Sequence, residues 1–214
     1  MRYSKDIGAI SMQEHEIIRN KKILVAGCGS VGGFVIEGFA RLGVGRMMAV
    51  DNEAFVMSNL NRQPFSTEKN IGKEKVYVAR ERVKEINSDV LFSGINDDIR
   101  SVKIEGVDLI FDCSSNMDTK LFLRELSKET RTPLVSASIG GWKGVVCICS
   151  PECDVFEREY SAYAKELLEK GSMTYFTASH AASIMIARAL QMMLGRVERI
   201  EGEVIKFDME NFKL

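Results

Sequence analysis

Short apolar runs alternate along this chain with longer stretches in which apolar residues recur every three or four positions. The short runs have the length of buried strands, and the longer spacing is typical of helices that pack one side on a core. The runs predict strands over residues 23–26, 47–50, 90–95, 107–111, 134–138 and 144–149, and a closing strand or hairpin over 202–211. The longer stretches predict helices over residues 8–19, 27–42, 73–86, 117–130, 161–169 and 178–194.

Alternation of strands and helices predicts an α/β fold, a Rossmann-like, doubly wound and mainly parallel sheet. The run over 107–111 is apolar throughout, which is typical of a central parallel strand. The run over 144–149 is rich in β-branched residues and is expected to pair antiparallel, so the C-terminal part of the sheet should be antiparallel. No repeat or low-complexity linker divides the chain, which predicts one domain over residues 1–214.

A glycine-rich turn separates the first strand from the helix after it. Gly27, Gly29 and Gly32 have the G-x-G-x-x-G spacing, with the strand before and the helix after that a nucleotide-binding turn requires. Gly27 would allow the sharp turn, Gly29 would let the backbone approach a phosphate, and Gly32 would let helix and strand pack closely. The free N–H groups at the start of the helix would face the anion.

Polar residues also follow the other strands of the predicted sheet. Asp51 ends the second strand, 24 residues after Gly27, close to the spacing at which a carboxylate meets a nucleotide ribose. Taken alone, Asp51 is better explained as a turn residue at a strand end. The polar stretches 112–116 and 138–141 follow two further strands. Because the carboxyl ends of parallel strands lie at one edge, we expect these residues to surround one ligand site.

Composition narrows the class of protein. The chain has 29 basic and 30 acidic residues, so its charge gives no reason to expect a nucleic-acid partner. No apolar window reaches the roughly 18 residues of a membrane span, and the first twenty residues lack the apolar stretch of a targeting segment. The five cysteines are an odd number, which favours reduced thiols. We therefore expect a cytoplasmic protein that does not bind membranes.

Two kinds of nucleotide are compatible with the glycine turn. An NAD-dependent oxidoreductase would use Asp51 for a ribose and usually avoids cations near the pyrophosphate. An ATP-using enzyme needs such cations, and the polar stretch after Asp51 supplies Arg62, Lys73 and Lys75. The G-x-x-x-x-G-K-[ST] loop is missing from the sequence, which weighs against handling of the γ-phosphate as in kinases. A non-catalytic nucleotide-binding protein stays a further alternative.

Several motifs together resemble the E1-like adenylyltransferase superfamily, to which ThiF and MoeB belong. The resemblance covers roughly Arg2 to Leu194. The motifs that carry it are the run Arg2-Tyr3-Ser4-Lys5-Asp6, the glycine turn, Asp51, Asn59-x-x-Arg62-Gln63, Gly72-x-x-Lys75-Val76 and Asp112-Cys113-x-x-Asn116. The resemblance implies an enzyme that binds ATP and Mg²⁺ and adenylylates a carboxylate with release of pyrophosphate. It also implies a homodimer in which Arg2 or Lys5 reaches the partner's ATP.

The resemblance assigns roles to individual residues. Arg62 and Lys75 would be catalytic, because they would stabilise the charge that builds on the α-phosphate. The nucleotide would be bound by residues from each conserved motif, which are Gly27, Gly29, Gly32, Asp51, Asn59, Arg62, Gln63, Lys75, Asp112, Ser115 and Asn116. Among them, Asp51 would take the ribose hydroxyls, and Asn59, Arg62 and Gln63 would hold the phosphates.

The chain departs from the superfamily in residues that bind metals in its relatives. Ser115 stands where relatives commonly have an Asp that helps to hold magnesium, so the metal ligand is unknown. Cys149 and Cys153 form a C-x-x-x-C pair rather than the two C-x-x-C pairs of zinc-binding members, and we expect no structural zinc. Cys153 lies where some relatives have a reactive cysteine, but a structural role is the simpler interpretation.

The carboxylate substrate is the least defined part of the hypothesis. A short chain without zinc ligands resembles the E1-like enzymes of guanylylpyridinol (iron-hydrogenase) cofactor biosynthesis, which implies a small-molecule, pyridinol-type carboxylate. The alternative is the Gly-Gly C-terminus of a ubiquitin-like sulfur carrier such as ThiS or MoaD. Trp142 is flanked by glycines just after the fifth strand, where it would stack on an aromatic substrate or simply pack on the sheet edge.

The last predicted helix, over 178–194, is apolar nearly all round. Such a helix is buried on several sides, in the core of one chain or at an interface between two. Its sequence favours neither explanation, and the resemblance favours the interface.

Overall fold

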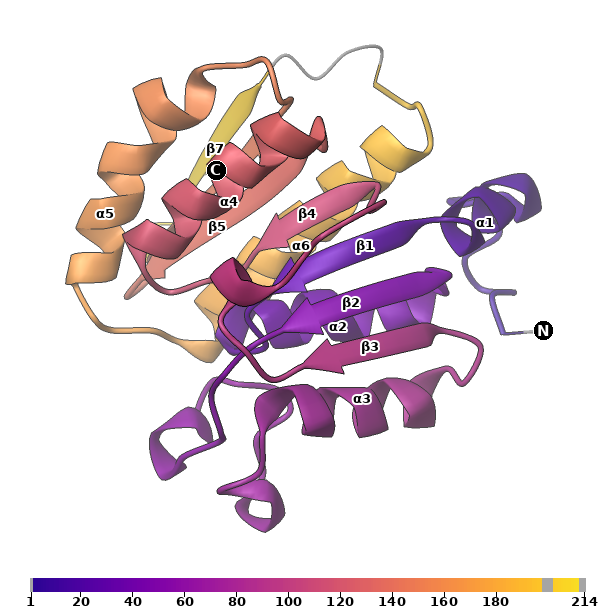
Figure 1. Ribbon diagram of the computed structural model, residues 1–214, viewed down its shortest axis with the longest axis horizontal. Coiled ribbons are helices and arrows are strands. Elements are labelled where there is room, and N and C mark those ends of the chain that lie inside the picture. Colours follow the sequence, from indigo (N-terminus) through magenta and orange to yellow (C-terminus); the bar gives the residue numbers. More distant parts are fainter. Residues whose placement is uncertain (1, 198–201, 212–214) are drawn as a thin grey trace.

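The computed structural model describes residues 2–197 and 202–211, in which a seven-stranded sheet forms the centre (Figure 1). The strands are β1 Lys22–Ala26, β2 Arg46–Val50, β3 Leu91–Ile95, β4 Leu109–Asp112, β5 Leu134–Gly140, β6 Lys143–Cys149 and β7 Glu203–Asp208. Their order is β3-β2-β1-β4-β5-β6-β7. The first five strands in this order are parallel, whereas β6 pairs antiparallel with β5 and β7 pairs antiparallel with β6. The predicted doubly wound fold with an antiparallel C-terminal part is confirmed.

Helices cover both faces of this sheet (Figure 1). They are α1 Met12–Arg19, α2 Ser30–Leu42, α3 Lys75–Ile86, α4 Met117–Thr130, α5 Ser161–Glu169 and α6 Tyr175–Met193. Buried residues of α2, α3 and α6 share one apolar cluster with the sheet, and those of α4 and α5 share the other. Short helical turns occur at η1 Met57–Asn59, η2 Glu68–Asn70, η3 Ile99–Ser101 and the π-helical η4 Phe156–Tyr160.

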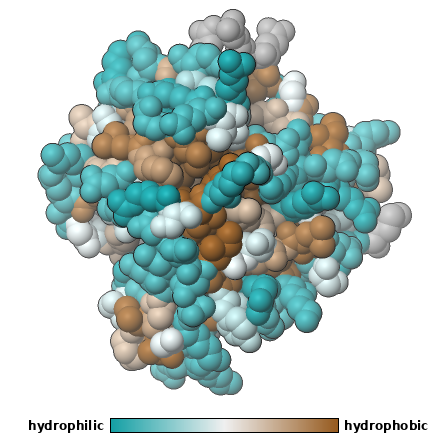
Figure 2. Space-filling model, in the orientation of Figure 1, coloured by the Kyte–Doolittle hydropathy of each residue, from teal (hydrophilic) through white to brown (hydrophobic). Residues whose placement is uncertain are grey.

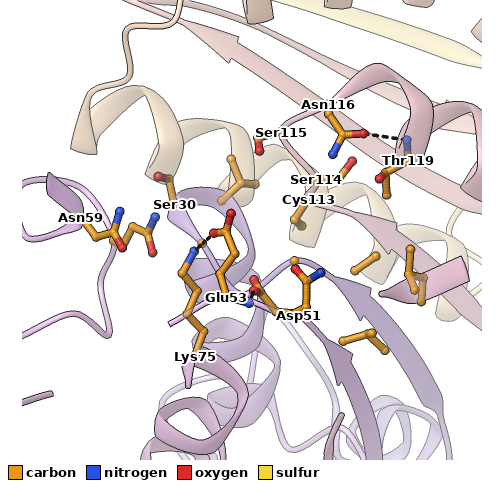
Figure 3. Close-up of a pocket in the computed structure, with 18 of the residues that line it drawn as sticks. Ser30, Asp51, Glu53, Asn59, Lys75, Cys113, Ser114, Ser115, Asn116 and Thr119 are labelled. Carbon is orange, nitrogen blue, oxygen red and sulfur yellow. Dashed lines mark hydrogen bonds and ion pairs between the residues drawn. The ribbon is translucent and has the colours of Figure 1, made fainter. Parts of the chain in front are cut away.

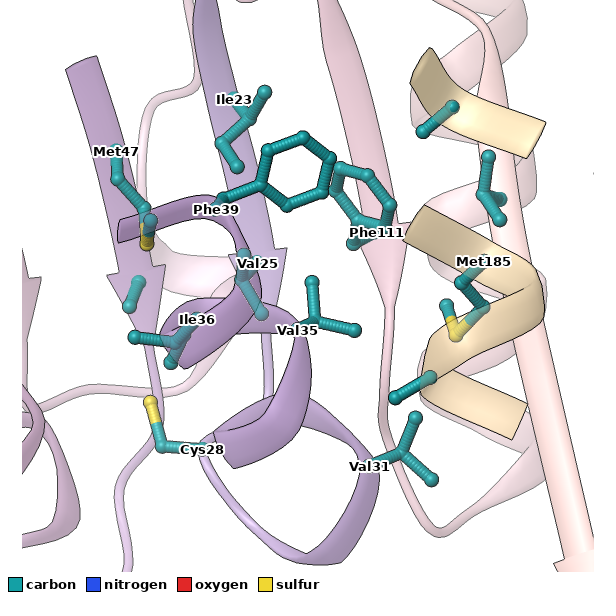
Figure 4. Packing of buried hydrophobic residues seen from close by; sticks show 14 of the residues in the cluster. Ile23, Val25, Cys28, Val31, Val35, Ile36, Phe39, Met47, Phe111 and Met185 are labelled. Carbon is teal, nitrogen blue, oxygen red and sulfur yellow. The ribbon is translucent and has the colours of Figure 1, made fainter. Parts of the chain in front are cut away.

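Strand β1 explains why the central runs are apolar at every position. Ile23 and Val25 belong to the cluster under α2, whereas Leu24 and Ala26 belong to the cluster under α4 and α5. Successive side chains of a strand point to opposite faces, so a strand covered on both sides must be apolar throughout. Figure 4 shows the first of these clusters, in which the ring of Phe39 lies 5.1 Å from that of Phe111.

Several predicted boundaries were displaced by local hydrogen bonds. The first helix begins at Met12 rather than residue 8, because Ser11 and Glu14 form a reciprocal capping box. Met12 is 57% exposed and so does not share the buried side of His15 and Ile18. The last helix begins at Tyr175 rather than residue 178, because Thr174 caps it.

Smaller differences concern the ends of other elements. The third helix begins two residues later than predicted, β4 is shifted by one to two residues, and the β5–β6 hairpin extends both of its strands. The π-helical turn η4 precedes the predicted helix over 161–169, in a segment predicted to be irregular. In the described part of the chain, none of the helices is apolar over a length sufficient to span a bilayer.

The N-terminal segment lies where the parallel strands begin, at the end of the sheet where Figure 1 marks the N-terminus. The ring of Tyr3 stacks on His15 at 4.5 Å, and Asn87 donates a hydrogen bond to the Tyr3 hydroxyl. Arg2 donates to the carbonyl oxygen of Ile86 at the end of α3. Arg2 therefore lies away from the carboxyl ends of the strands in its own chain.

Candidate functional site

A cleft of about 670 Å³ opens at the carboxyl ends of the parallel strands. It lies where the strand order reverses between β1 and β4, the position at which doubly wound folds bind ligands. Backbone hydrogen bonds bring the strand ends together: Gly27 N–H donates to Val50, and Cys113 N–H donates to Ala26. The cleft is therefore built where the sequence analysis expected polar residues to converge.

The glycine turn leaves no room for side chains between β1, α2 and β4. Gly27 has a φ of +95°, and a Cβ added there would lie 2.8 Å from the carbonyl oxygen of Cys113. A Cβ on Gly32 would lie 1.8 Å from the carbonyl oxygen of Gly27. Gly27 and Gly29 line the cleft, whereas Gly32 lies behind the turn and serves packing. Gly29 precedes α2 without a side-chain cap, which leaves the first N–H groups of the helix for an anion.

Backbone N–H groups nearby hold the Asp51 side chain in place at the cleft. Its carboxylate accepts hydrogen bonds from the N–H groups of Cys28, at 2.6 Å, and of Glu53, at 2.8 Å. Burial raises the pKa of the Asp51 carboxyl, and the nearby Lys75 ammonium and the two N–H donors oppose that rise. The carboxylate is thus held rigidly at the end of β2, where the sequence analysis placed a ribose acceptor.

Lys75 is the first residue of α3, and its side chain is only 3% exposed. Its ammonium group pairs with the carboxylate of Glu53, which is 67% exposed at the mouth of the cleft (Figure 3). A lysine this deeply buried needs a counterion. The sequence analysis did not predict Glu53 as a site residue. Its position two residues after Asp51 was the available signal, because the two side chains could lie on the same side of the chain.

The segment from Ser58 to Gln63 presents polar groups to the cleft. Asn59 accepts a hydrogen bond from the N–H of Val56 and so holds the turn. Arg62 donates through Nη1 to the Ser58 carbonyl oxygen and, at 3.1 Å, to Asn61. Its Nε and the Oε1 of Gln63 are buried without a hydrogen-bond partner among the described residues. Buried polar atoms usually have partners, so these two are available to a ligand.

Asp112 does not line the cleft, contrary to its predicted contact with the nucleotide. It is fully buried and accepts hydrogen bonds from Ser114, Lys120 and Ser136, the last two at 3.1 and 2.5 Å. Lys120 also donates to the Ala137 carbonyl oxygen at 2.7 Å. Asp112 therefore supports the wall of the cleft from behind.

The hydroxyl of Tyr160 extends this network. It lies 2.7 Å from the Ser136 hydroxyl and 3.0 Å from that of Ser138, which lines the opposite wall. Ser114 lines the wall formed by the end of β4. A continuous chain of buried hydrogen bonds thus joins the ends of β4 and β5 below the cleft.

Ser115 and Asn116 line the cleft as predicted. The Oδ1 atom of Asn116 accepts the N–H of Thr119 and caps α4 (Figure 3). Sequence reasoning missed the charged residues Asp97, Asp98 and Arg100, which come from the turn after β3. The Arg100 guanidinium lowers the pKa of Asp98 to about 2. Across residues 2–197 and 202–211, the acidic, histidine and cysteine side chains form no group of three suited to a metal ion.

The other singled-out residues lie outside the cleft. Cys149 pairs with Leu134 at the start of β5, so Cys149 and the nearby Cys153 are at the opposite end of the strands from the cleft. Trp142 lies three residues beyond Ile139 of the cleft wall, is 48% exposed, and packs on Phe176 at 4.5 Å. The position of Cys153 does not support a catalytic role at this cleft.

Comparisons with known proteins agree with this geometry. The sequence profile of the ThiF family matches residues 3–214. Over 97% of its length the chain is 23% identical to the molybdopterin-synthase adenylyltransferase of Salmonella typhimurium, covering 88% of that protein. It is also 29% identical over 69% of its length to the adenylyltransferase and sulfurtransferase MOCS3 of Xenopus laevis, but spans only 34% of that relative. The crystal structure of Escherichia coli MccB with ATP matches 99% of this chain and 69% of MccB, with a TM-score of 0.86 and 19% identity, which shows a shared fold.

Replacing Lys120 by Met should destabilise the protein strongly, because the buried Asp112 carboxylate would lose the ammonium group that pairs with it. The expected loss is about 3–5 kcal/mol of unfolding free energy, measured by urea denaturation. The matched control is Lys128→Met on the same helix, where the partly exposed ammonium pairs with surface carboxylates and should contribute less than about 1 kcal/mol. A loss of the same size in both variants would contradict the role of the buried pair.

Proposed function

Because the chain belongs to the ThiF family, we propose that it is an ATP-dependent adenylyltransferase that activates a carboxylate as an acyl-adenylate and releases pyrophosphate. The relatives that it matches are adenylyltransferases by name. The observation that carries the proposal is that Arg62 and Lys75 meet the uncapped start of α2 around one cleft. An NAD-dependent enzyme would have no comparable use for these two cations.

ATP would lie across the strand ends in a single orientation. Its ribose hydroxyls would meet Asp51, and its base would lie toward the apolar side chains of Val50 and Ile99 on the same side of the cleft. Its phosphates would meet the N–H groups of α2, the unpartnered Nε–H of Arg62, and Lys75. This orientation gives the buried Arg62 Nε an anionic partner.

The chemistry would be a displacement at the α-phosphorus. A carboxylate oxygen forms the new bond, the bond to the bridging oxygen of the β-phosphate breaks, and pyrophosphate leaves with that electron pair. Negative charge builds on the α-phosphate and on the leaving group, and Lys75 and Arg62 would stabilise it. Arg62 offers a planar fork to phosphate oxygens, whereas Lys75 acts as a point charge.

The described residues do not form a magnesium cage by themselves. Ser115 has no negative oxygen, both carboxylate oxygens of Asp51 accept backbone N–H groups, and the Glu53 carboxylate is paired. Magnesium commonly binds through one or two carboxylates together with phosphates and water. Any Mg²⁺ that accompanies ATP would therefore depend mainly on the triphosphate and water.

The acceptor that we propose is a small aromatic carboxylate of the pyridinol type. Trp142 and Phe176 form an aromatic pair beside the β5 wall, and the exposed half of Trp142 offers a face on which a flat ring could stack. The second candidate acceptor is the Gly-Gly C-terminus of a ubiquitin-like sulfur carrier such as ThiS or MoaD, which the named relatives favour.

We further propose that two copies of the chain form a homodimer through α6, with Arg2 or Lys5 reaching the partner's ATP. The apolar residues on one side of α6 pack within the same chain, because Ala178, Ala181 and Met185 are buried against the sheet. Apolar residues beside the buried ones are only partly covered, and they include Ile184, Ile186, Leu190 and Met192. A second copy would cover the exposed parts of these side chains.

Arg62→Ala should weaken ATP binding at least tenfold, since hydrogen bonds to a charged group contribute roughly 1.5–3 kcal/mol. Calorimetric titration with ATP measures the loss. Arg82→Ala is the matched control, because this arginine pairs only with surface carboxylates of α2 and α3 among the described residues and should leave the affinity unchanged. Tight binding of NADH with no binding of ATP would refute the adenylyltransferase proposal.

The choice of acceptor can be read from the chain's single tryptophan. A pyridine carboxylate added with ATP should quench Trp142 fluorescence and support pyrophosphate exchange, whereas Trp142→Leu should retain ATP binding and lose affinity for the carboxylate. Exchange with a Gly-Gly carrier protein, and none with any heteroaromatic carboxylate, would reverse the order of the two candidates.

Sedimentation at micromolar concentration should show a dimer. Ala187→Arg places a charge on the exposed side of α6 and should yield monomers that remain folded. Ala162→Arg on the exposed side of α5 is the control and should remain dimeric. Monomeric wild-type protein would rule out the dimer and any contact of Arg2 with a partner's nucleotide.

A further inference from the structure

The pairing of Lys75 with Glu53 is built into the backbone. The segment around Glu53 runs antiparallel to the segment around Lys75, with an isolated bridge between Ala54 and Glu74. The Lys75 N–H donates to the Glu53 carbonyl oxygen at 3.0 Å, and the Phe55 N–H donates to Lys73 at 3.0 Å. The two side chains therefore face each other because of this register and not through a chance rotamer.

The two partners differ sharply in exposure. The Lys75 side chain is 3% exposed and stands at the first position of α3, where the positive end of the helix dipole disfavours a cation. The Glu53 side chain is 67% exposed and can turn into water with little loss. Of the two, only Glu53 can leave the pair for water, and its departure leaves the buried Lys75 ammonium in need of another anion.

The cleft as a whole does not carry excess positive charge. Its lining has three cationic side chains, Arg62, Lys75 and Arg100, and four anionic ones, Asp51, Glu53, Asp97 and Asp98. Asp98 is itself paired with Arg100, and Asp51 is fixed by backbone N–H groups. A polyanion that enters beside Lys75 would meet the Glu53 carboxylate first, and the two negative charges would compete for one ammonium.

We propose that Glu53 is an anionic placeholder: it neutralises Lys75 in the empty cleft and is displaced from it by the phosphates of the incoming nucleotide. The inference rests on the proposed function, which places phosphates at Lys75. In the nucleotide-free protein the carboxylate balances the charge of the buried Lys75 ammonium and holds it in place. In the nucleotide complex a phosphate takes over the same ammonium, and Glu53 turns toward solvent. Glu53 thereby lowers the affinity for polyphosphates and makes Lys75 ready for them.

The test uses inorganic tripolyphosphate as the probe, so that base and ribose contacts do not contribute. Calorimetric titration should show that Glu53→Gln binds tripolyphosphate about three- to tenfold more tightly than the wild-type protein. Glu74→Gln is the matched control, because it removes the same charge from an exposed residue directly beside Lys75 and should change the affinity less than twofold. Glu53→Asp, which keeps the charge but shortens the reach, should lie between the two.

A second readout separates this role from a purely structural one. Without ligand, Glu53→Gln should melt at a lower temperature than the wild type, because Lys75 loses its counterion, and tripolyphosphate should raise its melting temperature more than that of the wild type. Tripolyphosphate binding by Glu53→Gln that is weaker than wild type, or no tighter than Glu74→Gln, would overturn the proposal. Tighter binding by Glu53→Gln together with no carboxylate-dependent pyrophosphate exchange by the wild type would instead uphold the placeholder and reject the adenylyltransferase function.

Discussion

The rest of this fold depends on a steric constraint. The backbones of β1, α2 and β4 lie so close together that no Cβ atom fits at Gly27 or Gly32. Because these two residues have no side chains, α2 can start directly above the end of β1 and beside the end of β4. The N–H groups of the helix then face the reversal point of the strand order. The position and the polarity of the cleft both follow from that close approach.

The charged residues around the cleft form two groups, one behind its wall and one facing its interior. Behind its wall, Asp112 and Lys120 are both fully buried and satisfied by serine hydroxyls and a carbonyl oxygen, so that they stiffen the ends of β4 and β5. In front, the buried ammonium of Lys75 relies on one exposed carboxylate. Breaking the buried pair of Asp112 and Lys120 would cost much folding free energy, whereas Lys75 can exchange one anionic partner for another. A rigid frame with exchangeable contacts at its surface suits a site that must accept and release a polyanion.

The sequence predicted the helices and strands better than the contacts between them. Apolar runs located the central strands β1 and β4 clearly, because strands covered on both faces have no alternative composition. Helix starts were misplaced where a cap decided them, as at Ser11 and Thr174, because the prediction followed apolar spacing and not capping signals such as the S-x-x-E pattern that begins at Ser11. The motifs located Asp51, Arg62 and Lys75 at one cleft. They could not reveal that Asp112 would face a lysine eight residues later and a serine 24 residues later, because that pairing depends on how α4 and β5 pack.

Two half-buried cysteines lie at opposite ends of the sheet. Cys113 lines the cleft, whereas Cys153 follows β6 at the end where β5 begins. Within the described chain, Cys28, Cys147 and Cys149 are buried. Burial raises the pKa of the Cys113 and Cys153 thiols, so neither is a strong nucleophile at neutral pH, and the chemistry of the cleft falls to its charged and polar side chains.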